Sequence, residues 1–280
     1  MPDSQNPHAT QLPSYAPMLA AYHEAFGPEL AAMIRSVPAR PGPGRNAVRI
    51  LDVACGDATY ARLWSEQLGV ASEIVALDLS RAWLASAAEQ IVDRPIALCQ
   101  AKVDALPFAD GAFDVAWCPQ SLYSLPDMQA CLNEMVRVVR SEGIVALVEN
   151  DELHHILLPW PIDVELHLRA AEWKAFRQQH GPPSRFYVGR WLTRLLRTAG
   201  LRHVRERCYA SVRQQPLTPP TSKYLTEYLR ALRARVTPHL KPRMARRLAE
   251  LADPDHRRFL LRRPDLTVIC LDRLVTGVKP

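Results

Sequence analysis

The sequence predicts an α/β fold organised around a doubly wound, largely parallel sheet. Short apolar segments of strand length recur from residue 48 to residue 149, and stretches with helical spacing separate them. Such alternation, with strands that are apolar throughout, is typical of a parallel sheet covered by helices on both faces. The first apolar segment also runs directly into a glycine-bearing turn and a helix, in ILDVACGDATY at residues 50–60.

Each element follows from the spacing of apolar residues and from turn signals. Strands are expected near 48–53, 73–77, 96–100, 113–118, 143–149, 202–213 and 265–277, which makes a seven-stranded sheet. Helices are expected near 59–68, 81–91, 127–139, 162–180 and 187–199. Residues 14–37 predict a helix that stops at Gly27–Pro28 and a second helix after it, because proline interrupts helical hydrogen bonding.

These elements divide the chain into four predicted parts. Residues 1–45 form an N-terminal helical cap and linker, and residues 46–150 form a ligand-binding core. Residues 151–200 form a helical insert on the substrate side, and residues 201–280 hold the last two strands. Between those strands, at about 219–262, two amphipathic helices carry leucines on one face and arginines on the other.

Composition narrows the class of protein. A chain of 280 residues with 48% hydrophobic and 23% charged residues fits a globular protein. The six cysteines are scattered without a Cys-x-x-Cys pair, which argues against a zinc site or a disulfide framework. There is no apolar stretch long enough to span a bilayer and no signal-peptide pattern, so we expect a cytoplasmic protein without a membrane span.

Positive charge is concentrated near the C-terminus. The net charge is +6, but residues 201–263 alone hold 16 Lys and Arg against 5 Asp and Glu. The basic helices could be a solvated or dimer-forming face, a docking site for an acidic substrate or carrier, or a nucleic-acid contact. No RNA-binding motif or row of aromatic residues accompanies them, so nucleic acid is disfavoured and a homodimer remains an option.

The glycine turn excludes two common nucleotide sites. A nicotinamide site needs Gly-x-Gly-x-x-Gly, and a P-loop needs Gly-Lys-Ser/Thr. The chain has Asp52-Val-Ala54-Cys-Gly56-Asp-Ala58 instead. This stretch resembles motif I of the class I S-adenosylmethionine-dependent methyltransferases, D-x-G-x-G-x-G. The resemblance continues for about 100 residues: Asp78 ends EIVALDLS, Asp104 lies in AKVDALPF, and FDVAWCPQ and EMVRVVRSEGIVALVE follow in order.

The resemblance implies a Rossmann-like sheet with an antiparallel last strand, and S-adenosylmethionine as cofactor. It implies that Gly56 and its turn hold the methionine end, Asp78 the ribose and Asp104 the adenine. The cofactor-binding residues implied in this way are Tyr22, Asp52, Ala54, Cys55, Gly56, Asp78, Leu79, Val103, Asp104, Ala105, Cys118, Pro119 and Gln120. Two motif glycines are replaced: Ala54 is tolerable without a pyrophosphate, whereas Ala58 puts a methyl group near the methionine moiety.

The sequence offers three candidates for the general base and does not choose between them. The loop after the fourth strand reads Leu122-Tyr-Ser-Leu-Pro-Asp127 and lacks the histidine that many small-molecule members carry. His154 and His155 follow the fifth strand, at the face where parallel sheets bind ligands, and Tyr123 is a third candidate. Cys118 stands where metal-assisted members have an aspartate, so we expect no metal site.

The acceptor is expected to be a small molecule. The [DN]-P-P-[YF] motif of amine methylases is replaced by Trp117-Cys-Pro-Gln120. Aromatic residues after the fifth strand, namely Trp160, His167, Trp173, Phe176, Phe186 and Tyr187, suit a planar or lipophilic acceptor or form the insert's own core. We therefore expect methylation of an O, N or C atom of such a molecule. The alternatives are an RNA methyltransferase using residues 219–262, a non-catalytic cofactor-binding module, and an enzyme of related chemistry such as a cyclase or decarboxylase.

Overall fold

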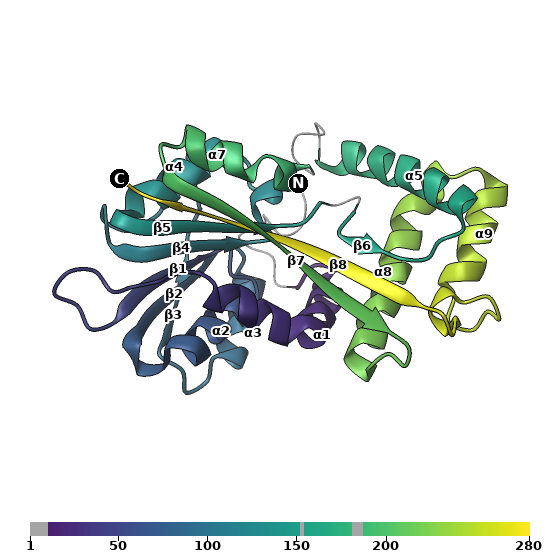
Figure 1. Cartoon of the computed structure of the whole chain (residues 1–280), viewed down its shortest axis with the longest axis horizontal. Helices are drawn as coiled ribbons and strands as arrows, with labels where there is room; N and C mark the ends of the chain where they lie inside the picture. Colours follow the sequence, from purple (N-terminus) through teal and green to yellow (C-terminus); the bar gives the residue numbers. More distant parts are fainter. Residues whose placement is uncertain (1–10, 152–153, 181–186) are drawn as a thin grey trace.

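The sheet at the centre of the computed structural model has eight strands (Figure 1). The structure describes residues 11–151, 154–180 and 187–280. The strands are β1 Val48–Val53, β2 Ser72–Asp78, β3 Ile96–Gln100, β4 Phe113–Pro119, β5 Val139–Glu149, β6 Ile156–Leu157, β7 Arg202–Gln214 and β8 Thr267–Val278. Their order is β3-β2-β1-β4-β5-β8, and β7 pairs with β8 as well. Strands β1 to β5 are parallel, while β8 runs antiparallel to β5, which confirms the predicted fold class.

The seven predicted strands are all present, and the eighth is a two-residue addition. Strand β6 pairs with β8 at Ile156 and Leu157, one step beyond the end of β5. The long β8 therefore pairs first with β6 and then with β5 along the same edge. This arrangement leaves Leu271 and Asp272 opposite the break between β5 and β6.

Helices cover both faces of the sheet, as continuous apolar strands require. They are α1 Ala16–Arg35, α2 Thr59–Leu68, α3 Arg81–Gln90, α4 Met128–Val138, α5 Ile162–His180, α7 Leu192–Thr198, α8 Pro219–Val236 and α9 Pro242–Ala252. One core cluster joins α1, α2 and α8 to the face that carries Ile50 and Trp117. The other joins α4 and α7 to the face that carries Leu51 and Ala116. No helix in the described ranges is long and apolar enough to cross a bilayer.

The predicted break at Gly27–Pro28 is wrong, because α1 continues through it. Proline removes one helical hydrogen bond. Apolar residues on both sides of Pro28, including Phe26 and Leu30, are fully buried in the same core cluster. Packing of that continuous face therefore outweighs the lost bond. The expected helix at 187–199 is likewise shorter, since a 3-10 turn at Val188–Arg190 precedes α7.

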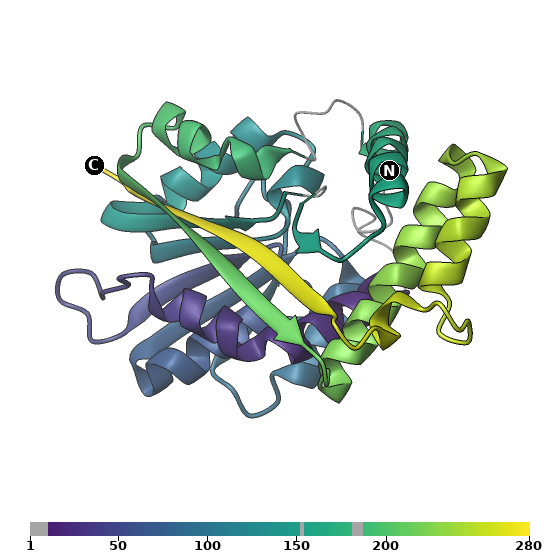
Figure 2. The ribbon, with the colours of Figure 1, turned by 45° about the vertical axis from the view of Figure 1, so that its right-hand side comes forward.

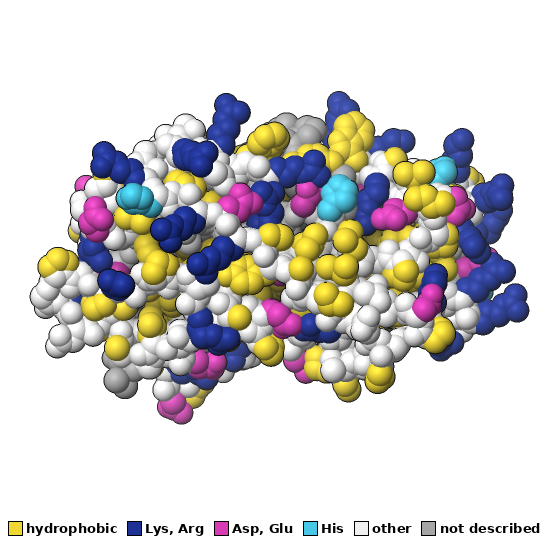
Figure 3. Space-filling view, viewed as in Figure 1, with side chains coloured by type: hydrophobic (Ala, Val, Ile, Leu, Met, Phe, Trp, Pro, Cys, Tyr) yellow, Lys and Arg dark blue, Asp and Glu magenta, His cyan; other side chains and the backbone are white. Residues whose placement is uncertain are grey.

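The inserts lie beyond the carboxyl ends of the parallel strands. Figure 2 shows α5, α8 and α9 standing beside one another at that end of the sheet. Helix α8 packs against α1 and α5 through Tyr224, Leu225, Leu229 and Leu232, all buried. Lys and Arg side chains gather at the right-hand edge of the view in Figure 3, over the part of the chain that α9 occupies.

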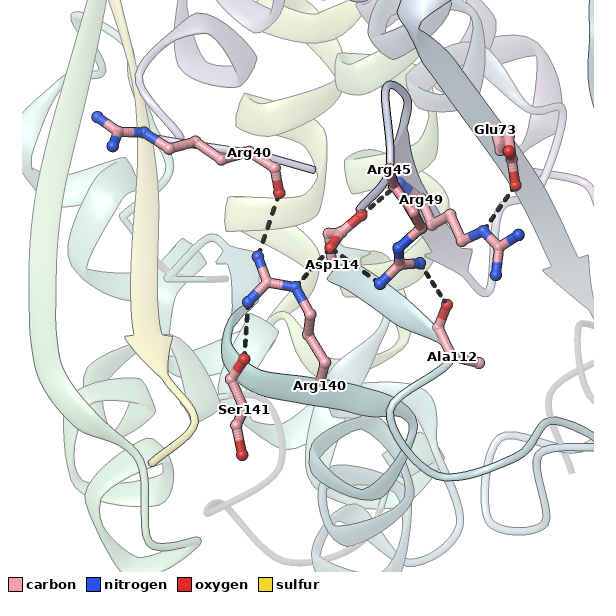
Figure 4. A network of polar contacts seen from close by, with 8 residues as sticks. All are labelled: Arg40, Arg45, Arg49, Glu73, Ala112, Asp114, Arg140 and Ser141. Atoms are coloured by element: carbon pink, nitrogen blue, oxygen red, sulfur yellow. Dashed lines mark hydrogen bonds and ion pairs between the residues drawn. The ribbon is translucent and has the colours of Figure 1, made fainter. Parts of the chain in front are cut away.

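The opposite end of the sheet holds a cluster of charges around Asp114, near the start of β4 (Figure 4). The Asp114 carboxylate is buried and accepts from Arg140 Nε at 2.6 Å and from the Arg49 backbone N–H at 2.8 Å. Arg45 lies 3.5 Å from the same carboxylate. Both carboxylate oxygens are thus matched by donors, two of them from positively charged side chains, and the cluster fastens the linker before β1 to β4 and β5.

Candidate active site

A cavity of about 1280 Å³ opens at the carboxyl ends of β1, β2, β4 and β5. This is the end of a doubly wound sheet at which ligands bind, where the strand order reverses between β1 and β4. Helices α1, α5 and α8 provide further walls. Of the residues predicted from motifs, the cavity is lined by Tyr22, Ala54, Cys55, Gly56, Asp78, Leu79, Val103, Asp104, Pro119, Gln120, Tyr123 and His155.

The turn after β1 is shaped for close approach of a ligand. Gly56 has φ +54°, a left-handed conformation that glycine adopts without a steric penalty. A Cβ added at Gly56 would contact only the Trp83 ring, at 3.9 Å, so the turn is open toward the cavity. Its backbone N–H donates to Asp78 Oδ2 at 3.0 Å, which ties the turn to the end of β2.

Asp78 is placed to accept further hydrogen bonds from a ligand. Its Oδ1 accepts from the Ser80 backbone N–H at 2.8 Å, and its Oδ2 accepts from Gly56. A carboxylate offers about four lone-pair sites, so acceptor capacity remains for a ligand hydroxyl in the cavity. Burial raises the pKa of Asp78, although the Ser80, Gly56 and Leu79 backbone groups partly oppose that shift.

Three side chains that the sequence analysis did not select line the cavity beside the turn: His23, Asp57 and Tyr60. His23 Nδ1 lies 3.6 Å from Asp57 Oδ2, too far for a regular hydrogen bond. Both ring nitrogens of His23 and the Tyr60 hydroxyl are buried without a hydrogen-bond partner among the described residues. Burial acts to raise the pKa of Asp57, but His23 and Thr59 bring it below its ordinary value. Buried polar groups of this kind are normally satisfied, so a polar ligand group would complete them.

Three predicted cofactor residues lie outside the lining of the cavity. Asp52 and Cys118 are strand residues whose side chains are fully buried within the sheet layers, and Ala105 follows Asp104 with its side chain turned to the surface. Burial raises the pKa of Asp52 well above its ordinary value, and the Ala61 backbone amide opposes this only in part. Burial likewise raises the pKa of the Cys118 thiol.

The two replaced motif glycines keep the backbone shape of glycine. Ala54 has φ +55° and Ala58 has φ +59°, both left-handed and therefore costly for a residue with a Cβ. Ala58 is fully buried and directly precedes α2, so its methyl group packs into the core rather than standing in the cavity. Both alanines thus store strain in the backbone, and only Ala54 lines the cavity.

Two of the three predicted base candidates line the cavity, and the third lies outside it. Tyr123 and His155 line the cavity, and the His155 ring packs edge-on against Tyr228 at 5.6 Å. His154 is exposed and outside the lining, where its Nδ1 lies 3.2 Å from both Asp151 Oδ1 and Arg190. Within the described ranges, no three His, Cys, Asp or Glu side chains gather as a metal site would require.

The far wall of the cavity is aromatic. It combines Phe176 of α5 with Tyr224 and Tyr228 of α8, followed by Ala231 and Ala234 one turn further along. Of the aromatic insert residues, Phe176 alone lines the cavity among those the structure describes. Trp160 is buried in the core, His167 bonds the Asp163 carbonyl, Trp173 and Tyr187 lie under Arg177 and Arg190, and Phe186 lies outside the described residues.

Arginine side chains approach the outer end of the cavity. Arg230 and Arg235 of α8 and His239 line it there. Arg235 lies over the Phe176 ring at 4.7 Å and 3.3 Å from the buried Glu172, while Arg230 pairs with Glu227. Arg230 and Arg235 are therefore engaged in contacts within the chain.

Asp272 is a buried acid behind the cavity that sequence motifs do not indicate. It accepts a 2.8 Å hydrogen bond from the Tyr22 hydroxyl, 250 residues away in the chain. The alternation of β8 could have pointed to it, since Asp272 shares a strand face with the buried Val268, Cys270 and Leu274. An acidic residue at an inward-facing position of an otherwise apolar strand is the sequence signal that could have identified Asp272.

The residues present fit the cofactor implied by the resemblance. The open Gly56 turn and Asp78 line one cavity together with His23 and Tyr60, whose buried polar atoms have no hydrogen-bond partner in the described residues. S-adenosylmethionine carries a ribose diol and an amino-acid end that need such acceptors and donors. Asp104 lies at the same end, where an adenine amino group would require an acceptor.

Comparisons with known proteins agree with this geometry. Residues 51–147 match the family described as a methyltransferase domain. A demethylmenaquinone methyltransferase of Desulfitobacterium hafniense (strain Y51) is 32% identical over 120 residues, 41% of this chain and 46% of that protein. A malonyl-(acyl-carrier protein) O-methyltransferase of Enterobacter lignolyticus (strain SCF1) is 31% identical over 121 residues, 42% of this chain and 46% of that protein.

The solved structures extend the likeness to the fold of nearly the whole chain. A candidate methyltransferase from Bacillus halodurans C-125 aligns with a TM-score of 0.56 at 18% identity, covering 91% of this chain and 100% of that chain. By sequence, the match spans just under half the length of either relative named above. The family match at residues 51–147 runs from β1 to β5 and includes the turns between these strands that build one side of the cavity.

Proposed function

We propose that this chain uses its class I S-adenosylmethionine-dependent methyltransferase domain to methylate an O, N or C atom of a small aromatic or lipophilic molecule. The match of residues 51–147 to a methyltransferase domain supports this resemblance and, with it, S-adenosylmethionine as the cofactor. The acceptor and the acceptor atom are the parts that the proposal adds.

The cofactor would supply a methyl group on a positively charged sulfur, and an O–H or N–H acceptor that takes the methyl group releases a proton. The chain's own residues would bind and orient both reactants. The Gly56 turn, His23 and Tyr60 would hold the amino-acid end, Asp78 the ribose and Asp104 the adenine. Positioning of two reactants in a closed site supplies much of the rate enhancement in displacements of this type.

The observation that carries the proposal is the continuity of one cavity. The same 1280 Å³ space reaches from Gly56 and Asp78 to the aromatic wall of Phe176, Tyr224 and Tyr228. A cavity of that size has room for a cofactor and a second molecule, since typical ligand pockets hold about 300–1,000 Å³. The wall that remains beside the cofactor is aromatic and apolar, which suits a planar or lipophilic acceptor.

The relatives support a small-molecule acceptor in two ways. One is named as a methyltransferase of demethylmenaquinone and the other as a methyltransferase of a malonyl group on acyl-carrier protein. An RNA acceptor has less support, because three arginines of the basic helices form ion pairs within the chain. Arg235 pairs with Glu172, Arg230 with Glu227, and Arg247 with Glu250.

The experiment is a methyl-transfer assay with radiolabelled S-adenosylmethionine and a panel of acceptors. The panel contains phenols, indoles, 1,4-naphthohydroquinones, medium-chain fatty acids and a transfer-RNA mixture. We expect transfer to one of the small aromatic or lipophilic compounds, and loss of that preference in Phe176→Ala. Transfer to RNA alone would favour the basic helices as the acceptor site. Binding of S-adenosylhomocysteine without transfer to any compound would favour a non-catalytic module or a related chemistry.

A further inference from the structure

A buried pair of acid and phenol lies beside the cavity, where the phenol Tyr22 lines it and the acid Asp272 lies behind the phenol. The Tyr22 hydroxyl of α1 donates to Asp272 Oδ1 of β8 at 2.8 Å. Tyr22 lines the cavity, whereas Asp272 lies behind it, 2% exposed. The Tyr22 ring also packs against Tyr224, the first ring of the aromatic wall, with centroids 5.4 Å apart.

Two amides fix this pair in place. Gln120, directly after β4, donates from Nε2 to the Tyr22 oxygen at 3.2 Å. Asn150, directly after β5, donates to Asp272 Oδ1 at 2.7 Å and to the Leu271 carbonyl at 3.3 Å when its amide is oriented to suit its neighbours. Both amides line the cavity and come from the strand ends where the acceptor would meet the methyl group.

The Tyr22 oxygen retains capacity for one more hydrogen bond. A phenol oxygen donates one proton and has two lone pairs. Here the proton goes to Asp272 and one lone pair accepts from Gln120. The second lone pair is available to an O–H or N–H group in the cavity that Tyr22 lines.

We infer that Tyr22 and Asp272 form the proton relay that takes up the acceptor's proton during methyl transfer, an inference that rests on the proposed function. Tyr22 is the catalytic residue, because its oxygen contacts the acceptor. Asp272 acts through Tyr22 as the final proton acceptor. Gln120 and Asn150 hold the Tyr22 hydroxyl and the Asp272 carboxylate in position.

The relay balances in protons and charge. The acceptor's O–H or N–H bond breaks and its proton binds the Tyr22 oxygen. In the same step the original Tyr22 O–H bond breaks, and that proton binds Asp272 Oδ1. The electron pair released on the acceptor would form its new bond to the methyl carbon, while the bond from that carbon to the cofactor's sulfur would break and leave its electron pair on the sulfur. Tyr22 ends neutral, the Asp272 carboxylate ends as a carboxylic acid, and solvent exchange restores the carboxylate.

The surroundings suit each group to its role. Burial raises the pKa of Asp272 to about 6, although the Tyr22 and Gln120 hydrogen bonds oppose part of that shift. Such a carboxylate is ionised at neutral pH and still accepts a proton readily, which is the condition for an effective general base. Burial and the nearby Asp272 charge raise the pKa of Tyr22 well above its ordinary value, so Tyr22 conveys a proton and does not ionise by itself.

Other charged and titratable groups surround the pair from each neighbouring element. Glu29 of α1 raises the pKa of Asp272, and it is paired at 2.7 Å with Arg213 of β7. Burial and the Asp272 charge raise the pKa of Tyr60 of α2 and of Cys270 of β8. The groups that hydrogen-bond to Asp272 in the described ranges are Tyr22, Gln120 and Asn150, all neutral.

The first test measures the Asp272 carboxyl pKa by carbon NMR in the ligand-free protein. We expect titration near pH 6 in the wild type. In Tyr22→Phe we expect a higher midpoint, because the hydrogen bond that favours the carboxylate is lost. Tyr209→Phe is the matched control: Tyr209 lies opposite Asp272 in the β7–β8 register, but its hydroxyl bonds Ser36 instead. An ordinary midpoint near 4, or one that Tyr22→Phe does not move, would overturn the relay without reference to any acceptor.

The second test uses the acceptor identified in the methyl-transfer panel. Tyr22→Phe and Asp272→Asn should each lower kcat by about 100-fold or more, since general-base catalysis contributes about that much. Asp272→Asn should leave S-adenosylhomocysteine affinity unchanged, because Asp272 lies behind the cavity. The wild-type rate should rise with pH through the Asp272 midpoint near 6, and the Asp272→Asn rate should be flat over that range.

The outcomes separate the relay from the proposed function. Wild-type turnover together with an unaltered rate and pH profile in both variants would overturn the relay and leave the methyltransferase function standing. Loss of S-adenosylhomocysteine binding in Tyr22→Phe would make Tyr22 a cofactor-binding residue instead. A wild type that transfers no methyl group to any compound would contradict the proposed function itself.

Discussion

Asp114 and Asp272 are buried to the same degree, at 1% and 2% exposed, yet they lie at opposite ends of the sheet in opposite surroundings. Asp114 lies near the start of β4 and receives two arginine side chains and a backbone N–H. Asp272 lies at the cavity end and receives hydrogen bonds from neutral groups, the Tyr22 phenol and the Asn150 amide. Burial alone therefore does not say what an acid is for.

The difference extends to the neighbours of each acid. At the Asp114 end, the donors come from the linker, β1 and β5, so the contacts join pieces of the fold (Figure 4). At the cavity end, Asp78 keeps spare acceptor sites, and His23 and Tyr60 keep unsatisfied polar atoms. One end of the sheet satisfies its polar groups internally, and the other leaves them for ligands.

Removing the Asp114 carboxylate should have the largest effect on stability. Asp114→Ala leaves Arg140 and Arg45 without their buried partner, and breaking a buried ion pair from one side costs about 3–5 kcal/mol. Urea unfolding measures the loss, with Asp114→Asn as a milder variant if the alanine protein does not fold. Glu73→Gln is the control, because the exposed Glu73–Arg49 pair should contribute less than about 1 kcal/mol. A loss for Asp114→Ala no larger than that of Glu73→Gln would remove the contrast between the two ends.

Asp272 should instead make stability depend on pH. Its folded-state pKa of about 6 lies above the ordinary value, so the folded state binds more protons than the unfolded state between about pH 4 and 6. Its contribution to stability is therefore greatest below pH 4 and is lost as the pH rises through 6, by about 2–3 kcal/mol. Asp272→Asn should gain stability relative to the wild type over that window. The measurement is the free energy of unfolding of both proteins from pH 4 to 7. A constant difference between the two over that range would show that the pKa of Asp272 is not raised in the folded state.

The backbone at the cavity end offers a smaller test. Ala58 is left-handed, which costs an L-residue about 1–2 kcal/mol, so Ala58→Gly should relieve strain. The gain is reduced by the greater flexibility of glycine in the unfolded chain, and we expect a net stabilisation of about 0.5 kcal/mol. Ala61→Gly, inside α2, is the matched control and should destabilise by about 1 kcal/mol. Equal losses in both variants would show that the turn before α2 is not strained.

Most of the sheet could be predicted from the sequence because its signals are local. Continuous apolar runs such as β1 and β4, and turn residues between them, report buried parallel strands directly. The prediction of a break at Pro28 was wrong because Phe26 and Leu30 pack in the same core cluster. The local sequence does not reveal that long-range contact.

The site residues also fall into those that local motifs predict and those that come together only in the folded chain. Gly56, Asp78 and Asp104 lie in short motifs at strand ends, and all three line the cavity. Asp272 could not be assigned to Tyr22, because the two residues are 250 positions apart and meet only when β8 inserts beside β5. His23 and Tyr60 meet at the cavity for the same reason, since α1 must first fold over α2.

The most direct test of the account is calorimetric titration of S-adenosylhomocysteine into the wild type, Asp78→Ala and Asp110→Ala. Asp78 supplies the ribose acceptors in this account, whereas Asp110 is an exposed residue paired with Arg137 away from the cavity. Loss of two hydrogen bonds to a charged group, at about 1.5–3 kcal/mol each, predicts an affinity at least about 100-fold weaker in Asp78→Ala and unchanged in Asp110→Ala. Equal affinity in all three proteins would contradict the claim that the acids at the cavity end are kept for a ligand.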